Sequence, residues 1–448
     1  MRLKQTCPGF MGEFGKCAVA FCLSVVIALG ALLIACFAPQ GRINENLLES
    51  SYGLYLEGQY PVIGDRKTNS LLDNATDTTI LRATGGMNRH YLGSVLTNPL
   101  YMYSNVELEK EEDYPVKCLE LYSVGEPSDG EFLYVRYWMG FRAILRWLLV
   151  FFDYYQIKRY AGALFFALFA LVLCDLAKRV DGKTAFAFAV SIILVRPQVI
   201  VGSLQFLPCF LIAFLAMLAV PILTDRPRWD GVFFLEIGIL TMYFDFYTTP
   251  LVAVGLPLVY LAVLRARQGK PSTLRWMLRC VLIWLAGYAL MWLAKLTLTS
   301  LLTSVDGLAD GFAAFARRTG ITKSEGYEEY YSLSLAFENL RSVIFSDAEG
   351  KAVYLLGAGL TALLVCVCAI RRKLRLPTFA ASAYLLFAAV LPILWFACTA
   401  QPTAIHYWFQ YRSIALTHWA VGAYVTQTFW QGNRELAPQR GLCAKMRK

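Results

Sequence analysis

Long apolar stretches alternate with short polar loops along most of this 448-residue chain. A helix that crosses a bilayer needs about 20 mostly apolar residues, and about ten stretches approach that length. They are residues 17–38, 160–176, 185–201, 204–223, 232–244, 251–264, 277–298, 352–370, 379–398 and 414–429. The first stretch exceeds the apolar core of a cleaved signal peptide, so we expect an uncleaved helix. The pattern predicts an all-α polytopic membrane protein.

Composition supports this class, because 57% of the residues are hydrophobic and only 17% are charged. Soluble domains are nearer half apolar and a quarter charged. The net charge of +10 would raise nucleic acid as a partner of a soluble protein. Here the basic residues fall mostly in short loops, so we expect no nucleic-acid partner. Most of the 12 cysteines lie inside apolar stretches, which argues against a disulfide framework.

The basic loops also predict an orientation, since lysine and arginine concentrate on the cytoplasmic side of a membrane. With the N-terminus inside, the basic loops near residues 176–183, 224–230, 265–279 and 371–377 and the tail 430–448 also fall inside. We therefore expect a single integral domain over 1–448 in the cell membrane, with both termini cytoplasmic. Three polar segments then face outward: a large first loop (39–158), a second loop (299–351) and a short third one (399–412).

The end of the first loop, residues 131–160, alternates aromatic and basic side chains. Trp138, Phe141 and Leu145 recur at helical steps, which is typical of an amphipathic helix in the membrane interface. Arg142 and Arg146 lie one turn apart and have the spacing to hold an anionic lipid headgroup. Plain anchoring without a ligand is the simpler interpretation of the same pattern.

Two carboxylates stand four residues apart in the first loop, in the sequence SLLDNATDTTIL (70–81). On a helix, Asp73 and Asp77 would share a face and repel each other, which raises the pKa of one of them. Such a pair can act as acid and base, and it is also compatible with a divalent ion. Two solvated aspartates on a surface loop are the alternative.

Other polar residues from distant parts of the chain fall near the same outer face. They are Asp245, Arg196, Gln205, Lys295, His406 and Arg412. Ionisable residues at membrane depth are costly and tend to be functional. The basic members suit a phosphate, and an acid suits activation of a hydroxyl acceptor. The charged stretch 317–332 either covers such a site or is an ordinary solvated loop.

Three stretches then resemble the glycosyltransferase-C superfamily, in particular bacterial membrane glycosyltransferases. They are YWMGFRAILRWLL (137–149), FDFYTTPLV (244–252) and QPTAIHYWFQYR (401–412). The resemblance implies sugar transfer from a polyprenyl-phosphate donor to a cell-envelope acceptor on the extracytoplasmic face. It assigns the general base to Asp73 or Asp77, the lipid-phosphate approach to Tyr137, Trp138, Arg142 and Arg146, and phosphate or leaving-group contacts to His406 and Arg412.

The chain departs from the family pattern in two places. Met139 stands where a histidine follows the tryptophan, and Gln401, Pro402 and Thr403 replace an Asn-His-Ser triplet. These departures keep a non-catalytic scaffold open as an alternative. A transporter or flippase for a lipid-linked or anionic substrate is another, supported by Pro197 and by Glu236 within an apolar stretch. A transporter places polar residues near the midplane, often in repeated halves, and no repeat is visible.

Overall fold

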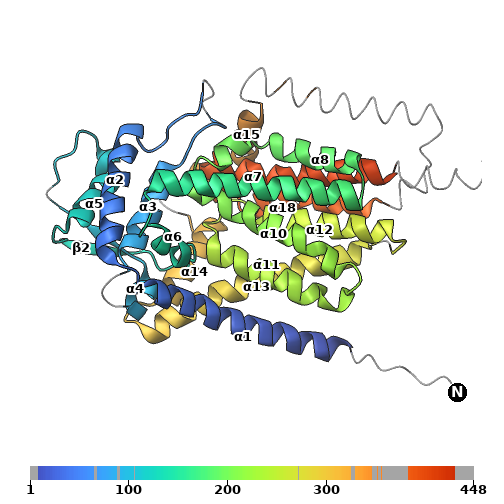
Figure 1. The fold of residues 1–448 in the computed structure, drawn as a ribbon, viewed down its shortest axis with the longest axis horizontal. Coiled ribbons are helices and arrows are strands. Elements are labelled where there is room, and N and C mark those ends of the chain that lie inside the picture. Colours follow the sequence, from blue (N-terminus) through green and yellow to red (C-terminus); the bar gives the residue numbers. More distant parts are fainter. Residues whose placement is uncertain are drawn as a thin grey trace, which may run out of the picture.

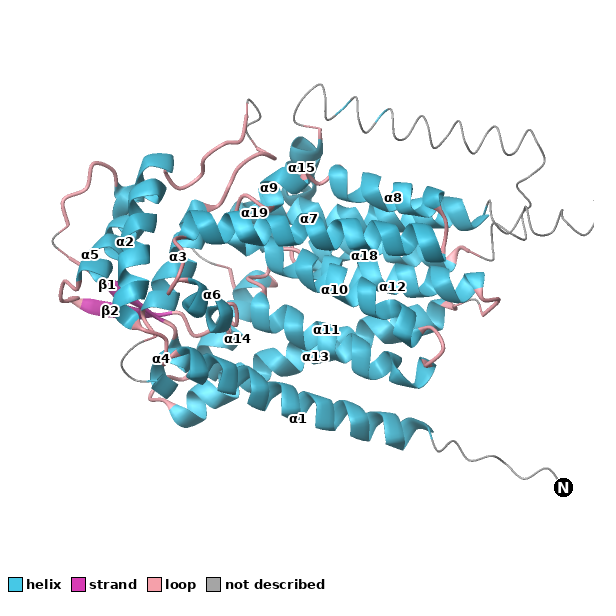
Figure 2. Ribbon diagram, viewed as in Figure 1, coloured by secondary structure: helices cyan, strands magenta, loops and turns pink. Residues whose placement is uncertain are grey.

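The computed structural model describes residues 9–64, 68–87, 91–104, 106–270, 272–323, 328–345, 351, 355 and 382–428. Over these residues the chain is mostly helical, with one two-stranded sheet (Figures 1 and 2). Five helices are long and apolar enough to cross a membrane: Gly12–Ala35, Tyr154–Arg179, Leu204–Leu223, Pro250–Arg267 and Leu274–Leu302. The molecule is therefore an all-α protein of the membrane-spanning class.

The membrane bundle contains these long helices and several shorter ones. Its elements are α1 (Gly9–Ala35), α7 (Tyr154–Arg179), α8 (Gly182–Ile193), α9 (Pro197–Ile200), η2 (Leu204–Phe206), α10 (Leu207–Leu223), η3 (Pro227–Trp229), α11 (Asp230–Phe244), α12 (Pro250–Arg267), α13 (Leu274–Leu302) and α18 (Tyr384–Cys398). Residues 415–428 form a further helix. The predicted stretch 352–370 and the tail 430–448 lie outside the described residues, apart from residue 355.

Local chemistry alters two of the predicted spans. The stretch 185–201 is split, because α8 ends at Ile193 and Arg196 takes a left-handed backbone (φ 61°) before Pro197 opens α9. Arg196 and Pro197 within this stretch predict a break or kink near its end, because proline cannot continue a helix, and the break is confirmed. The short stretch 160–176 becomes the 26-residue α7, because Asp153 and Gln156 form a reciprocal capping box that starts the helix earlier. The stretch 232–244 forms the 15-residue α11.

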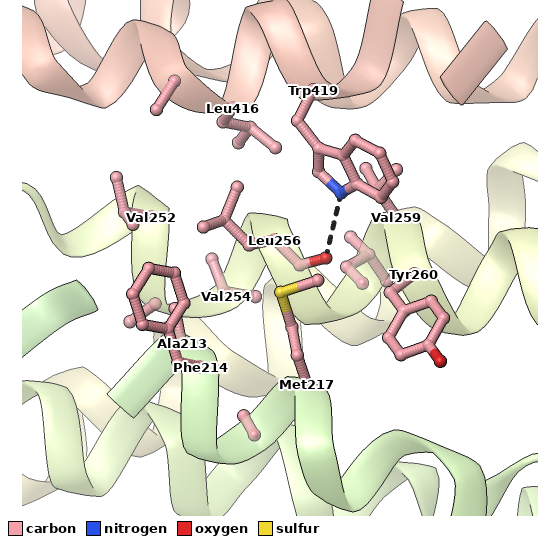
Figure 3. Packing of buried hydrophobic residues seen from close by; sticks show 14 of the residues in the cluster. Ala213, Phe214, Met217, Val252, Val254, Leu256, Val259, Tyr260, Leu416 and Trp419 are labelled. Atoms are coloured by element: carbon pink, nitrogen blue, oxygen red, sulfur yellow. Dashed lines mark hydrogen bonds between the residues drawn. The ribbon is translucent and has the colours of Figure 1, made fainter. Parts of the chain in front are cut away.

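Helix α12 lies at the centre of the bundle, where nearly all its residues are buried. Phe214 and Met217 of α10 pack on one side of it, and Leu416 and Trp419 on the other (Figure 3). The Trp419 indole donates a hydrogen bond to the carbonyl oxygen of Leu256 at 3.2 Å, so its polar atom is satisfied inside an apolar core.

The first loop folds into a compact lobe at one end of the bundle (Figure 1). This first-loop lobe (residues 39–153) contains α2 (Gln40–Glu57), α3 (Asn74–Gly85), α4 (Tyr91–Thr97), η1 (Glu111–Asp113), α5 (Tyr114–Val124) and α6 (Arg142–Leu148). Its strands β1 (Pro99–Met102) and β2 (Gly130–Leu133) pair antiparallel, with Pro99 opposite Leu133. Two apolar clusters join the lobe to α1, α7, α11 and α13.

The second and third polar segments pack around the same end. They contain α14 (Gly307–Arg318), η4 (Glu328–Tyr331), α15 (Leu333–Ile344), α19 (Ala400–Gln410) and η5 (Tyr411–Ile414). Helix α15 packs on α19, and α14 packs on α13. The three segments that the charge pattern places on one side are thus neighbours in space.

The opposite end of the bundle is basic and is held together by ion pairs between its loops. Arg265 pairs with Asp230 at 2.7 Å, and Lys270 pairs with Asp225 at 3.3 Å. Arg267 pairs with Asp181, and Arg279 pairs with Glu13 near the start of α1. The basic loops between 176 and 279 therefore meet at one end, as the charge pattern predicts.

Candidate functional site

A cavity of about 550 Å³ opens where the first-loop lobe meets the bundle. It takes its walls from five separate parts of the chain. The lining residues are Tyr60, Asp73, Thr76, Thr79, Tyr134, Arg136 and Tyr137 from the lobe, Gln205 from η2, Phe246 and Tyr247 after α11, Ala314, Arg317 and Arg318 from α14, and Gln401, Pro402, Ile405, His406, Trp408 and Phe409 from α19. Acidic, basic, amide and aromatic groups thus face one space.

Asp73 is the carboxylate in the cavity wall. It is the N-cap of α3, where its carboxylate accepts hydrogen bonds from the backbone N–H and the hydroxyl of Thr76, each at 2.9 Å. The side-chain amide of Gln205 donates a third bond to it. Burial raises the pKa of Asp73 to about 6, against these hydrogen bonds, which lower it. The group therefore changes charge close to neutral pH.

Asp77 points elsewhere and does not line the cavity. Its carboxylate accepts hydrogen bonds from the Tyr154 hydroxyl (2.6 Å) and from the backbone N–H groups of Leu204 (2.8 Å) and Gln205 (3.1 Å). It is fully buried, and burial raises its pKa to about 7. Asp77 thus joins α3 to α7 and η2 and fixes the segment that carries Gln205.

Asp245 shapes a turn beside the cavity. Its carboxylate accepts bonds from the backbone N–H (2.9 Å) and hydroxyl (2.5 Å) of Thr248, a turn that the short side chain of aspartate favours. Inside this turn Tyr247 has φ 68°, which is uncommon for a bulky residue. Asp245 is buried and absent from the cavity wall, whereas its neighbours Phe246 and Tyr247 are part of it.

Three arginines supply the positive charge of the cavity. Arg136 pairs with Asp310 of α14 at 3.0 Å. Arg318 donates a hydrogen bond to the Tyr137 hydroxyl and lies over the rings of Tyr137 and Tyr247, at 5.4 and 5.1 Å. Arg317 lines the same cavity, and its side chain makes no hydrogen bond or ion pair within the described part of the chain. The cavity wall thus offers guanidinium groups to an anion.

His406 lies where α19 bends, with a non-helical φ of −110°. Its ring stacks on Phe409 with centroids 5.2 Å apart and lines the open cavity. Desolvation by the surrounding protein lowers the pKa of His406 below its ordinary value, and the positive charge of Arg318 lowers it further. The imidazole is therefore neutral at pH 7 and has both a donor and an acceptor nitrogen.

The structure gives Arg142 and Arg146 a different place from the interfacial one expected. Both are fully buried in α6. Arg146 donates to the carbonyl oxygens of Ala35 (2.9 Å) and Thr84 (2.8 Å), at the ends of α1 and α3. Arg142 donates to Val95 at 3.0 Å, near the end of α4. Helix C-termini carry partial negative charge, so these cations are satisfied inside the lobe and do not face a lipid headgroup.

Lys295 is likewise a buried cation that donates to a carbonyl group near a helix end. It is fully buried, and its ammonium donates to the carbonyl oxygen of Leu96 in α4. Trp138 is also buried, and its indole donates to the carbonyl oxygen of Met291 at 2.7 Å. These two contacts dock the first-loop lobe on α13. Neither residue lines the cavity.

Arg196 and Arg412 lie outside the cavity wall as well. Arg196 donates to the Ser70 hydroxyl at 2.8 Å. Arg412 is fully buried, with its guanidinium 4.6 Å from the centre of the Phe206 ring. Of the predicted residues, Asp73, Tyr137, Gln205 and His406 thus come together in one cavity. The other eight lie outside the cavity wall.

Sequence reasoning missed the arginines of α14 as part of the site. Arg317 and Arg318 end an alanine-rich helix, and basic residues at that position are common because they complement the helix dipole. The signal that was available is the charged stretch 317–332 in the outer second loop. Within the described part of the chain, no group of three or more His, Cys, Asp or Glu residues is placed to hold a metal ion.

Comparison of the chain with family models, curated proteins and solved structures gives no match. The fold therefore defines the class, a helical membrane-spanning protein with a first-loop lobe at one end. The chemistry of the cavity has to be argued from its own residues.

Proposed function

We propose that this protein transfers a sugar from a polyprenyl-phosphate donor to a hydroxyl acceptor, within the cavity, on the outer side of the membrane. The observation that carries the proposal is that buried Asp73 and the arginines of α14 face the same cavity beside the membrane bundle. A carboxylate with a pKa near 6 suits a general base, and guanidinium groups suit a phosphate leaving group.

In the proposed reaction the Asp73 carboxylate takes the proton of the acceptor hydroxyl. The acceptor oxygen bonds to the anomeric carbon while the bond from that carbon to the phosphate oxygen breaks. The bonding electrons leave with the lipid phosphate, whose negative charge Arg317 and Arg318 stabilise. Gln205 holds the Asp73 carboxylate in position, and attack opposite the leaving group inverts the anomeric centre.

The test uses the full chain in lipid vesicles with a panel of radiolabelled polyprenyl-phosphate sugars. We expect the Asp73→Asn variant to lose transfer by about 100-fold or more, because a general base typically contributes 10²–10⁴-fold. Asp77→Asn is the matched comparison, because that carboxylate lies outside the cavity and the amide keeps an acceptor oxygen for the N–H groups of η2, so we expect a smaller loss of activity than for Asp73→Asn. Arg317→Gln should lower kcat, because its guanidinium stabilises the negative charge that develops on the leaving phosphate.

The pH dependence follows from the raised pKa of Asp73. The base must be ionised, so kcat/KM should rise as pH increases to about 6 and level off above it. The absence of transfer with every donor, or an Asp73→Asn variant as active as Asp77→Asn, would contradict the proposal. Movement of the lipid across the bilayer without transfer would support a flippase instead.

A further inference from the structure

Helix α14 has its polarity reversed relative to a helix on a water-exposed surface. Its outward face carries Ala309, Phe312, Ala313 and Phe315, all of which are exposed. Its charged residues turn inward: Asp310 pairs with Arg136, Arg318 bonds to Tyr137, and Arg317 lines the cavity. A surface helix in water normally places its charged residues outward and its apolar residues inward. The outward face of α14 therefore fits an apolar medium.

The position of α14 along α13 shows how deep this face lies. Gly307 and Gly311 pack tightly on α13, where a side chain at Gly311 would meet Leu296 at 2.3 Å. From there α14 runs back along α13, so that the Phe312 and Phe315 rings reach Trp292, with centroids 5.8 and 6.3 Å away. Figure 1 shows α14 beside the outer end of α13.

The length of α13 places Trp292 at the edge of the hydrocarbon region. Counted from Met277, where the apolar stretch of α13 begins, about 20 helical residues span the roughly 30 Å of hydrocarbon, which ends near residue 296, about one turn beyond Trp292. Tryptophan is enriched at this boundary. Exposed leucines of α13, Leu290, Leu301 and Leu302, continue the apolar surface on both sides of it. Phe312 and Phe315 thus lie level with the acyl–headgroup boundary.

We propose that the outward face of α14 is a lipid-contact surface, with Phe312 and Phe315 inserted into the outer leaflet of the bilayer. The helix then separates lipid on its apolar face from the cavity on its charged face. This inference relies on the membrane-spanning fold and is independent of the proposed transfer reaction. It also places the arginine wall of the cavity at the level of lipid headgroups.

Photo-crosslinking of the full chain in vesicles tests the proposal. The vesicles contain phosphatidylcholine and phosphatidylglycerol with a radiolabelled acyl chain. The test variant is Phe315→p-benzoyl-phenylalanine (48% exposed), with Phe312 (52%) as a second position. The matched control is the same substitution at Phe132 of β2 (47%), on the first-loop lobe, and the positive control is Leu282 within α13 (53%).

We expect the Phe315 and Phe312 variants to crosslink lipid about tenfold more than the Phe132 variant, and nearly as well as the Leu282 variant. Lipid labelling at Phe315 no higher than at Phe132 would overturn the proposal. A crosslink from Phe315 to a polypeptide, whether a second copy or another protein, would also overturn it. Each variant is first shown to elute from a size-exclusion column at the same volume as the unmodified protein. A loss of labelling then cannot be attributed to a loss of folding.

Discussion

The residue at which α3 begins gives Asp73 and Asp77 different roles. A helix over the whole segment would place both carboxylates on one face. Instead α3 begins at Asn74, so Asp73 is its cap and opens to the cavity, whereas Asp77 lies in the first turn and points into the core. Asp77 receives two backbone N–H groups from η2 and a tyrosine hydroxyl. The four-residue spacing predicts two carboxylates on one helical face, but the N-cap position of Asp73 turns its carboxylate away from that of Asp77.

The role of Asp77 predicts a defined effect on stability. Asp77→Ala leaves the N–H groups of Leu204 and Gln205 buried without a partner, at a cost of about 1–3 kcal/mol each. Asp77→Asn keeps an acceptor oxygen, so its loss should be smaller. Thermal unfolding in detergent measures both, and Glu111→Ala, at an exposed position of the first-loop lobe, is the control. Equal melting temperatures for the Ala and Asn variants would contradict this role.

The raised pKa of Asp77 adds a dependence on pH with a definite sign. The folded state holds the proton up to about pH 7, whereas the unfolded chain loses it near 3.8. The folded state thus binds more protons in this window, so the contribution to stability is full below pH 3.8 and is lost as pH rises to 7. The melting temperature of the unmodified protein should therefore fall, relative to that of Asp77→Asn, between pH 4 and pH 7.

At the scale of elements, α6 shows why the sequence could not place the lobe arginines. Arg142 and Arg146 at helical spacing beside aromatics have the pattern of an interfacial helix. Their buried partners are carbonyl groups at the ends of α1, α3 and α4, which are distant in sequence. A backbone carbonyl leaves no mark in the sequence, unlike an acidic partner. By contrast, the break at Arg196–Pro197 needs only local information, and it was predicted.

The contacts of α6 predict how a substitution at Arg146 affects stability. A lysine keeps the charge but has no fork of donors, so Arg146→Lys loses contact with at least one of Ala35, Thr84 and Gln40. We expect the free energy of unfolding to fall by about 1–3 kcal/mol, seen as a lower melting temperature. Arg42→Lys, at an exposed position of α2, is the control and should change little. If Arg146 bound a lipid headgroup, the substitution would instead weaken binding to anionic lipid and leave the melting temperature unchanged.

The cavity depends on elements that only the whole fold brings together. Asp73, Gln205 and His406 stand out as polar residues beside apolar stretches, and three-dimensional structure places them in one wall with Tyr137. Arg136 and Arg318 were not expected there, because their partners Asp310 and Tyr137 come from the second and first outer loops. Loop charges predict which side a segment occupies, but they do not predict which loops touch.

The difference in charge between the two ends of the molecule predicts its orientation in the membrane. Basic loops paired with Asp181, Asp225, Asp230 and Glu13 form one end, and the first-loop lobe forms the other. Lysine and arginine in short loops stay cytoplasmic, so the lobe should face outward. Gly125 after α5 and Gly269 after α12 are exposed turn glycines with left-handed backbones (φ 84° and 77°) at these two ends.

An epitope inserted after each glycine in turn forms a matched pair, because exposed turns tolerate insertions. Antibody should bind the epitope at Gly125 in intact cells, whereas the epitope at Gly269 should become accessible only after permeabilisation. The reverse pattern would place the cavity on the cytoplasmic side and would exclude transfer at the outer face, even with Asp73 as the base. Labelling at both positions in intact cells would show that the two ends do not lie on opposite sides, which contradicts a bundle that spans the membrane.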